Sequence, residues 1–151
     1  MNLYLVQHAH ARREEEDPER HLSPVGKAAI REMARFAGEH VHVSKILHSG
    51  KARVRETAET LAETLRPREG VEATDGLDPK ADPAVWAERL RSSVADLMLV
   101  GHLPHLSRLA SLLLCGDEER TLISFQMGGI LYAQRSDDRW SVGWMVVPGL
   151  L

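Results

Sequence analysis

The stretch Leu3-Tyr4-Leu5-Val6, followed at once by Gln7 and His8, decides the fold. Four consecutive apolar residues without polar alternation favour a strand that is covered on both faces, as the strands of a parallel sheet are. A second run of this kind, Leu97-Met98-Leu99-Val100, ends on Gly101-His102. The sequence therefore predicts a parallel sheet with histidines at the carboxyl ends of two of its strands.

Helical patterns alternate with these strands. Ser23-Pro24 has the residue types of a helix cap and first turn, and the apolar residues that follow it predict one buried helix face, ending at Gly38. That face comprises Val25, Ala29, Met33 and Phe36. Three further helices are predicted before Pro67, from Asp82-Pro83, and between Pro104 and Gly116, with weaker strands at 43–47 and 71–74.

The end of the chain has a different pattern. Two segments rich in β-branched and aromatic residues, 129–134 and 140–147, flank Ser136-Asp137-Asp138-Arg139, which predicts a hairpin. Strand–helix alternation implies right-handed crossovers between parallel strands. We therefore predict one α/β domain over residues 1–151, a three-layer α/β/α sandwich with a mostly parallel central sheet and a C-terminal antiparallel hairpin.

Composition limits the function. The 151 residues carry a formal net charge of −3 and contain one cysteine, Cys115, so we expect no nucleic-acid partner and no internal disulfide. No apolar run is long enough to span a bilayer, and the first residues lack the features of a signal peptide, so we expect a cytoplasmic protein without a membrane partner. The pairs His8-x-His10 and His40-x-His42 lack a carboxylate at ligand spacing, so we expect no metal and no cofactor.

Three sets of polar residues follow predicted strands. They are Gln7-His8-Ala9-His10, then His48-Ser49 with Lys51, Arg53 and Arg55, and finally Gly101-His102. Ligands of open α/β sheets bind beyond the carboxyl ends of the strands, where these sets meet. One imidazole can attack an electrophilic phosphorus while the second histidine and an arginine neutralise the phosphoryl oxygens.

Four motifs in this order resemble the histidine phosphatase superfamily, which was once named for phosphoglycerate mutase. Leu3 to Ala9 is similar to the family's opening Leu-x-Leu-Val-Arg-His-Gly/Ala, and Arg20 to Gly26 is similar to its Arg-Pro-Leu-Thr-x-x-Gly stretch. Ser49 to Ala58 resembles Ser-Pro-x-x-Arg-Ala-x-Gln-Thr-Ala, and Val100 to Pro104 resembles the second-histidine motif. The short chain and the His-Leu-Pro sequence point to the small phosphohistidine phosphatase branch.

The resemblance implies a role for each matching residue. His8 would be the nucleophile that carries a transient phosphohistidine, and His102 would donate to the phosphoryl group as the second catalytic residue. Arg53 would bind the phosphoryl group, and Gln7 would line the same phosphate site. Ser49 would shape the loop before the helix, without a catalytic role. The charged run from Arg12 to Arg20 is expected to be a solvated loop, with a place at the border of the pocket as the alternative.

Two positions depart from the family pattern. Gln7 stands where the family has an arginine, so the pocket has neutral donors in place of a charged fork, and Lys51, Arg55 or His10 would have to supply the charge. Gly76 stands where the branch has a carboxylate, with Asp75 and Asp78 as neighbours. A phosphoramidate leaving group can be protonated by solvent, so the absence of a placed acid favours phosphohistidine as substrate.

Two functions follow from these features. The first is a metal-independent phosphatase that acts on a phosphorylated protein, with phosphohistidine as its target, or on a small phosphorylated substrate, through a phosphohistidine intermediate. The second is a catalytically impaired domain that binds phosphate or a phosphoprotein, and the replacement at Gln7 is the feature that favours it.

Overall fold

The computed structural model describes the whole chain, Met1–Leu151. A six-stranded sheet has the strand order β3-β2-β4-β1-β5-β6. The strands β3, β2, β4 and β1 run parallel to one another, β5 runs antiparallel to β1, and β6 runs antiparallel to β5. The strands are β1 (Asn2–Gln7), β2 (Lys45–His48), β3 (Val71–Ala73), β4 (Leu97–Gly101), β5 (Ile130–Ser136) and β6 (Arg139–Val146). The helices are α1 (Pro24–His40), α2 (Ala52–Leu65), α3 (Pro83–Ser92), α4 (His105–Cys115) and the short 3-10 helix η1 (Pro148–Leu150).

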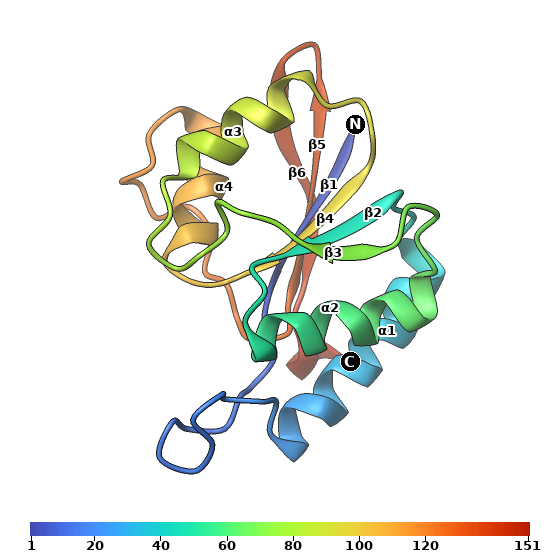
Figure 1. The fold of residues 1–151 in the computed structure, drawn as a ribbon. Coiled ribbons are helices and arrows are strands. Elements are labelled where there is room, and N and C mark those ends of the chain that lie inside the picture. Colours follow the sequence, from blue (N-terminus) through green and yellow to red (C-terminus); the bar gives the residue numbers. More distant parts are fainter.

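The sheet is the middle of three layers, with α1 and α2 on one face and α3 and α4 on the other (Figure 1). Alternate residues of β1 enter different cores: Tyr4 and Val6 pack with α1 and α2, whereas Leu3 and Leu5 pack with α3 and α4. A strand turns successive side chains to opposite faces, so an unbroken apolar run is what a strand between two helical layers requires. The predicted three-layer fold is confirmed.

Helix α1 departs from the prediction in two ways. It continues through Gly38 to His40. Gly38 lies against α2, where a Cβ atom would come within 2.8 Å of a Thr64 methyl carbon. Its buried face is also rotated from the predicted one: Ile30, Met33, Ala34 and Ala37 are buried, whereas Val25 is 71% exposed. The glycine signals close helix packing rather than a helix end.

The other element ends follow local chemistry. The Asp82 side chain accepts from the Ala84 N–H at the start of α3, and α4 ends on Gly116 in the left-handed region with φ +76°. The hairpin turns on Asp137 and Asp138, which both have positive φ, as two-residue hairpin turns require. No helix of the chain is both long and apolar enough to cross a membrane.

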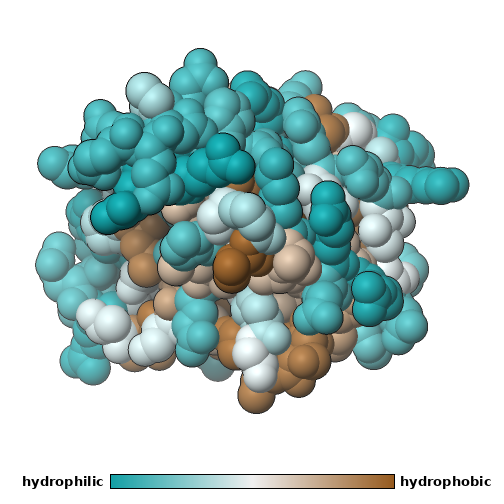
Figure 2. Space-filling model, turned by 90° about the horizontal axis from the view of Figure 1, so that it is seen from below, coloured by the Kyte–Doolittle hydropathy of each residue, from teal (hydrophilic) through white to brown (hydrophobic).

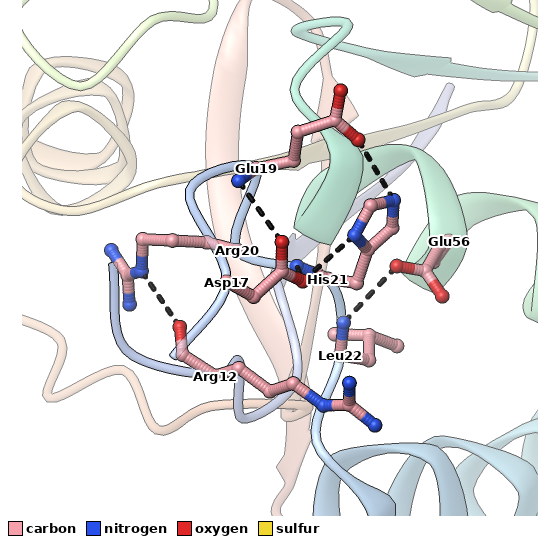
Figure 3. A network of polar contacts seen from close by, with 7 residues as sticks. All are labelled: Arg12, Asp17, Glu19, Arg20, His21, Leu22 and Glu56. Carbon is pink, nitrogen blue, oxygen red and sulfur yellow. Dashed lines mark hydrogen bonds and ion pairs between the residues drawn. The ribbon is translucent and has the colours of Figure 1, made fainter. Parts of the chain in front are cut away.

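The charged segment after β1 is an ordered loop with its own polar network (Figure 3). One Asp17 carboxylate oxygen accepts from the backbone N–H and the ring of His21, and the other accepts from the Glu19 N–H. Glu56 on α2 accepts from the N–H of Leu22, which fixes the loop to the helix. The predicted solvated loop is therefore exposed, and hydrogen bonds within it and to α2 define its shape.

Candidate active site

The two histidines singled out by the sequence face each other. His8 follows β1 and His102 follows β4, and these strands are paired neighbours in the sheet. Their ring centroids are 5.5 Å apart, with the ring planes inclined by 62°. A backbone bond from the His8 N–H to the Gly101 carbonyl, 3.1 Å long, keeps the two strand ends together. The two rings therefore lie together at one edge of the sheet.

The backbone of the next residue fixes the orientation of the His8 ring. His8 Nδ1 lies 2.8 Å from the Ala9 carbonyl oxygen, which can only accept, so Nδ1 carries the proton in the neutral ring. Nε2 then keeps its lone pair. His8 is thus held in the tautomer that a nucleophilic imidazole needs.

The second histidine contacts a serine and an arginine. His102 Nε2 lies 2.7 Å from Ser49 Oγ, and its Nδ1 lies 3.4 Å from Arg53 Nη2. A guanidinium only donates, so this contact leaves Nδ1 as acceptor and Nε2 as donor to Ser49. Ser49, expected only to shape its loop, therefore also contacts a histidine of the site.

Both rings are neutral at pH 7. Burial is the main cause that lowers the pKa of His8 to about 4; the charges of Arg53 and Arg20 lower it too, and the Ala9 hydrogen bond opposes the shift. Burial, followed by the charges of Arg53, His8 and Lys51, lowers the pKa of His102 to about 3. Burial and the charge of Arg20 also lower the pKa of Arg53. These lowered pKa values mean that the site disfavours further positive charge. A bound anion would offset the positive charges already there.

Thr57 on α2 connects the nucleophile loop to the arginine. Its Oγ1 accepts from the Ala9 N–H at 3.0 Å and donates to the Arg53 carbonyl at 2.7 Å. Thr57 and Ala9 are both fully buried. One hydroxyl therefore positions the residue that orients His8 and the helix turn that carries Arg53.

A basic pocket of about 510 Å³ opens next to these residues. Its lining includes Arg20, Lys51, Arg53 and Arg55 together with Glu14 and Glu19. Of these cations, none but Arg55 takes part in an ion pair. Arg53 Nε is buried without a hydrogen-bond partner, so a donor of this guanidinium is free. An anion would pair with these charges.

Arg20 is the cation of this pocket that the sequence did not single out. It lies close enough to His8 and Arg53 to lower the pKa of both. Its backbone adopts φ 54°, which few residues other than glycine adopt, and its Nε donates to the Arg12 carbonyl at 3.0 Å. The signal available was its place in the Arg20-His21-Leu22-Ser23 motif, but only the folded loop brings it to the site.

The structure separates the residues that were considered as substitutes for the missing arginine. Lys51 and Arg55 line the basic pocket, whereas Gln7 and His10 line a different pocket. His10 Nδ1 bonds Ser23 Oγ at 2.6 Å, and Gln7 Oε1 is buried without a partner. No hydrogen bond joins the Gln7 side chain to His8, His102 or Arg53.

Of the two acidic residues near Gly76, Asp75 is held in an ion pair, whereas Asp78 lies near His105, on whose pKa its charge acts. Asp75 accepts two hydrogen bonds from Arg89, at 2.9 and 3.0 Å, and its pKa is lowered by them. Gly76 has φ +78°, so a side chain there would be strained, and its Cβ atom would lie 3.1 Å from the Trp86 ring. No group of three or more His, Cys, Asp or Glu side chains is arranged to hold a metal ion.

Comparison with known proteins gives structural matches alone. No family model matches the sequence, and no curated protein does so either. The protein histidine phosphatase SixA in complex with tungstate matches with a TM-score of 0.87 at 23% identity, over 99% of each chain. A phosphoserine phosphatase mutant from Entamoeba histolytica, in complex with phosphoserine, matches with a TM-score of 0.72 at 13% identity, over 95% of each chain.

A third match is a mycobacterial glucosyl-3-phosphoglycerate phosphatase in complex with VO3, with a TM-score of 0.73 at 14% identity, over 95% of this chain and 97% of the other. The structural neighbours of this chain are thus phosphohistidine phosphatases and other members of the histidine phosphatase superfamily, and the chain shares their fold.

Proposed function

We propose that the protein is a phosphatase that removes the phosphoryl group from phosphohistidine in a protein. In the first step His8 Nε2 attacks phosphorus, the bond from phosphorus to the substrate nitrogen breaks, and the leaving imidazole takes a proton. In the second step water attacks the phosphohistidine of the enzyme and releases inorganic phosphate. His8 returns to its neutral form.

The observation that carries the proposal is the arrangement around His8. A neutral imidazole with a free Nε2 faces His102 at 5.5 Å between centroids, and Arg53, which contacts His102, has an unpartnered donor. His8 thus has the state of a nucleophile, and Arg53 can stabilise the charge on the phosphoryl oxygens. His102 can join it when its Nε2–H turns from Ser49 to a phosphoryl oxygen. Arg20 and Lys51 supply further positive charge, which supports activity despite the glutamine at position 7.

Two features support phosphohistidine over an alkyl phosphate ester. An alkoxide leaving group needs a proton from a positioned acid, whereas the nitrogen of a phosphoramidate can be protonated by water. Asp75 is paired with Arg89, and a side chain at position 76 would be strained by its positive φ. The reaction as proposed needs neither a metal ion nor a cofactor, and a cytoplasmic location belongs to the same proposal.

The test measures phosphate release from a peptide phosphorylated on histidine and from a phosphoserine peptide, with and without a chelator. We expect chelator-insensitive turnover of the phosphohistidine peptide by the unaltered protein and none by His8→Ala. A trapped phosphoenzyme should be stable in alkali and labile in acid. Equal turnover by His8→Ala would show that the nucleophile is misassigned.

A second function, binding without turnover, is favoured by Gln7. Its side chain lines the neighbouring pocket, and Arg53 is the one guanidinium with a direct contact to either histidine. The two functions are separated by one comparison. Tungstate binding with no turnover of either peptide would identify a binding domain, while binding together with turnover would identify the enzyme.

A further inference from the structure

A second pocket of about 550 Å³ begins at the residue before the nucleophile. Gln7 lines it, together with the start of α1, the segment before β5 and the start of η1. The apolar members of its lining include Val25, Ala29, Phe125, Met127 and Pro148. None of the lining residues is Asp, Glu, Lys or Arg, in contrast to the basic pocket beside Arg53.

Backbone contacts fix this pocket to the active site. The Gly128 N–H lies 2.9 Å from the Gln7 carbonyl and 3.2 Å from the His8 carbonyl, so the segment before β5 is bound to the end of β1. On the other side, α1 begins so close to His10 that a Cβ atom on Gly26 would lie 2.0 Å from the His10 carbonyl oxygen. The pocket therefore keeps its position relative to the nucleophile.

Large apolar side chains are exposed at this pocket. Val25 is 71% exposed and Met127 is 44% exposed, although the sequence pattern placed Val25 on a buried helix face. Figure 2 views the molecule from the end at which α1 begins, and it shows hydrophobic residues at the centre and lower edge of this face, with hydrophilic residues above and beside them. Apolar side chains that remain exposed next to a reaction site are typical of a surface that binds the substrate.

We propose that this pocket receives an apolar side chain of the phosphorylated protein, next to the residue whose phosphoryl group enters the active site. The proposal rests on the function proposed above and specifies its substrate as a protein segment rather than a small phosphorylated metabolite. The charge distribution supports this occupant, because the basic pocket on one side suits polar and acidic groups while the uncharged pocket suits an apolar one. On a helix, side chains three or four residues apart lie ~5–6 Å apart, so a helical peptide presents apolar side chains close to its phosphohistidine.

The test uses two synthetic helical peptides phosphorylated at the same histidine. One has leucines three and four residues to either side of the phosphohistidine, and the matched peptide has serines there. We expect kcat/KM of the unaltered protein to be about tenfold or more higher for the leucine peptide, since burial of one leucine side chain has an effect of this order.

Three variants locate the preference. Val25→Glu and Met127→Glu put a charge into the pocket at exposed positions, and a glutamate in the first turn of α1 is compatible with the helix dipole. Val94→Glu is the matched control, because Val94 is 89% exposed in the segment before β4, at the opposite end of that strand from His102. We expect the ratio of the two kcat/KM values to fall towards one in the first two variants and to stay unchanged in the control.

The outcomes separate this inference from the proposed function. Equal turnover of both peptides by the unaltered protein would overturn the pocket assignment and leave the phosphatase proposal standing. A preference that survives in Val25→Glu and Met127→Glu would likewise overturn it. If the protein dephosphorylates neither peptide and does not hydrolyse phosphoramidate, a small probe, the proposed function and this inference are overturned together.

Discussion

Replacement of Thr57 by valine tests whether one buried hydroxyl holds the active site together. Valine has nearly the same shape but removes both the bond from the Ala9 N–H, 3.0 Å, and the bond to the Arg53 carbonyl, 2.7 Å. The Arg53 carbonyl lies within α2 and keeps its helical surroundings. The Ala9 N–H is fully buried and would have no other acceptor.

The expected effect has two parts. A buried donor left without a partner costs about 1–3 kcal/mol in free energy of unfolding. Ala9 also orients the His8 ring through its carbonyl, so a shift of this residue moves the nucleophile. A displacement of ~1 Å at a reacting group can reduce the rate by ~10²-fold. We therefore expect Thr57→Val to lose about ten- to a hundredfold in kcat with little change in KM.

Thr57→Ser is the matched control, because it keeps the hydroxyl and loses one methyl group, worth ~0.8 kcal/mol of burial. Urea unfolding gives the stability of each variant, and phosphoramidate hydrolysis gives kcat. Serine should retain most of the rate while losing some stability. If Thr57→Val and Thr57→Ser have the same kcat, the hydroxyl does not position His8 and the reasoning is refuted.

Three further predictions concern charge. Gln7→Arg should raise kcat by part of the ~10²–10³-fold that one electrostatic donor contributes. A fall in kcat would show that another cation already takes the place of the missing arginine, and an unchanged kcat would show that position 7 lies outside the phosphoryl site. Tungstate binding near pH 6 should be accompanied by proton uptake, because the bound anion raises the lowered pKa of His8 and of His102. Calorimetry in two buffers of different ionisation enthalpy measures the number of protons taken up. Binding without proton uptake would contradict this prediction. His105 is fully buried with both ring nitrogens unpartnered, and burial lowers its pKa to about 4. Below pH ~6.5 the unfolded chain then binds more protons than the folded one, so stability falls as the pH drops from ~6.5 to about 4. Urea unfolding at pH 5 and pH 7 measures this loss of stability, and His105→Leu should make it smaller. An equal loss in both proteins would exclude His105 as a cause.

Sequence patterns predicted helices and strands well where a few neighbouring residues determine the element. The unbroken apolar runs of β1 and β4 gave the strands, and Asp82 and Gly116 gave helix ends, because covered strands and helix caps are specified within a few residues. Gly38 misled the prediction for the opposite reason. It is a helix breaker by propensity, but contact with α2 requires its small size inside α1.

In the candidate site, too, some features could be predicted from the sequence and others could not. The pairing of His8 with His102 could be predicted because parallel strands bring their carboxyl ends to one edge of the sheet. The roles of Arg20 and Thr57 could not, since one depends on the positive φ of an ordered loop and the other on a hydroxyl that bridges two elements. Loop conformation and side-chain contacts leave no periodic pattern in a sequence.

By itself, the sequence determined the layered α/β fold, the order of its elements and the two histidines at the strand ends, since hydrophobic periodicity and chain order suffice for these. Only the tertiary structure decided which ring nitrogen of His8 is free, which cations lie beside it, and that Val25 borders an uncharged pocket instead of the core. These features depend on distances between residues far apart in the chain, which packing of the three layers sets. Burial in the same packing also keeps the two histidines neutral, and so determines the chemistry that they can perform.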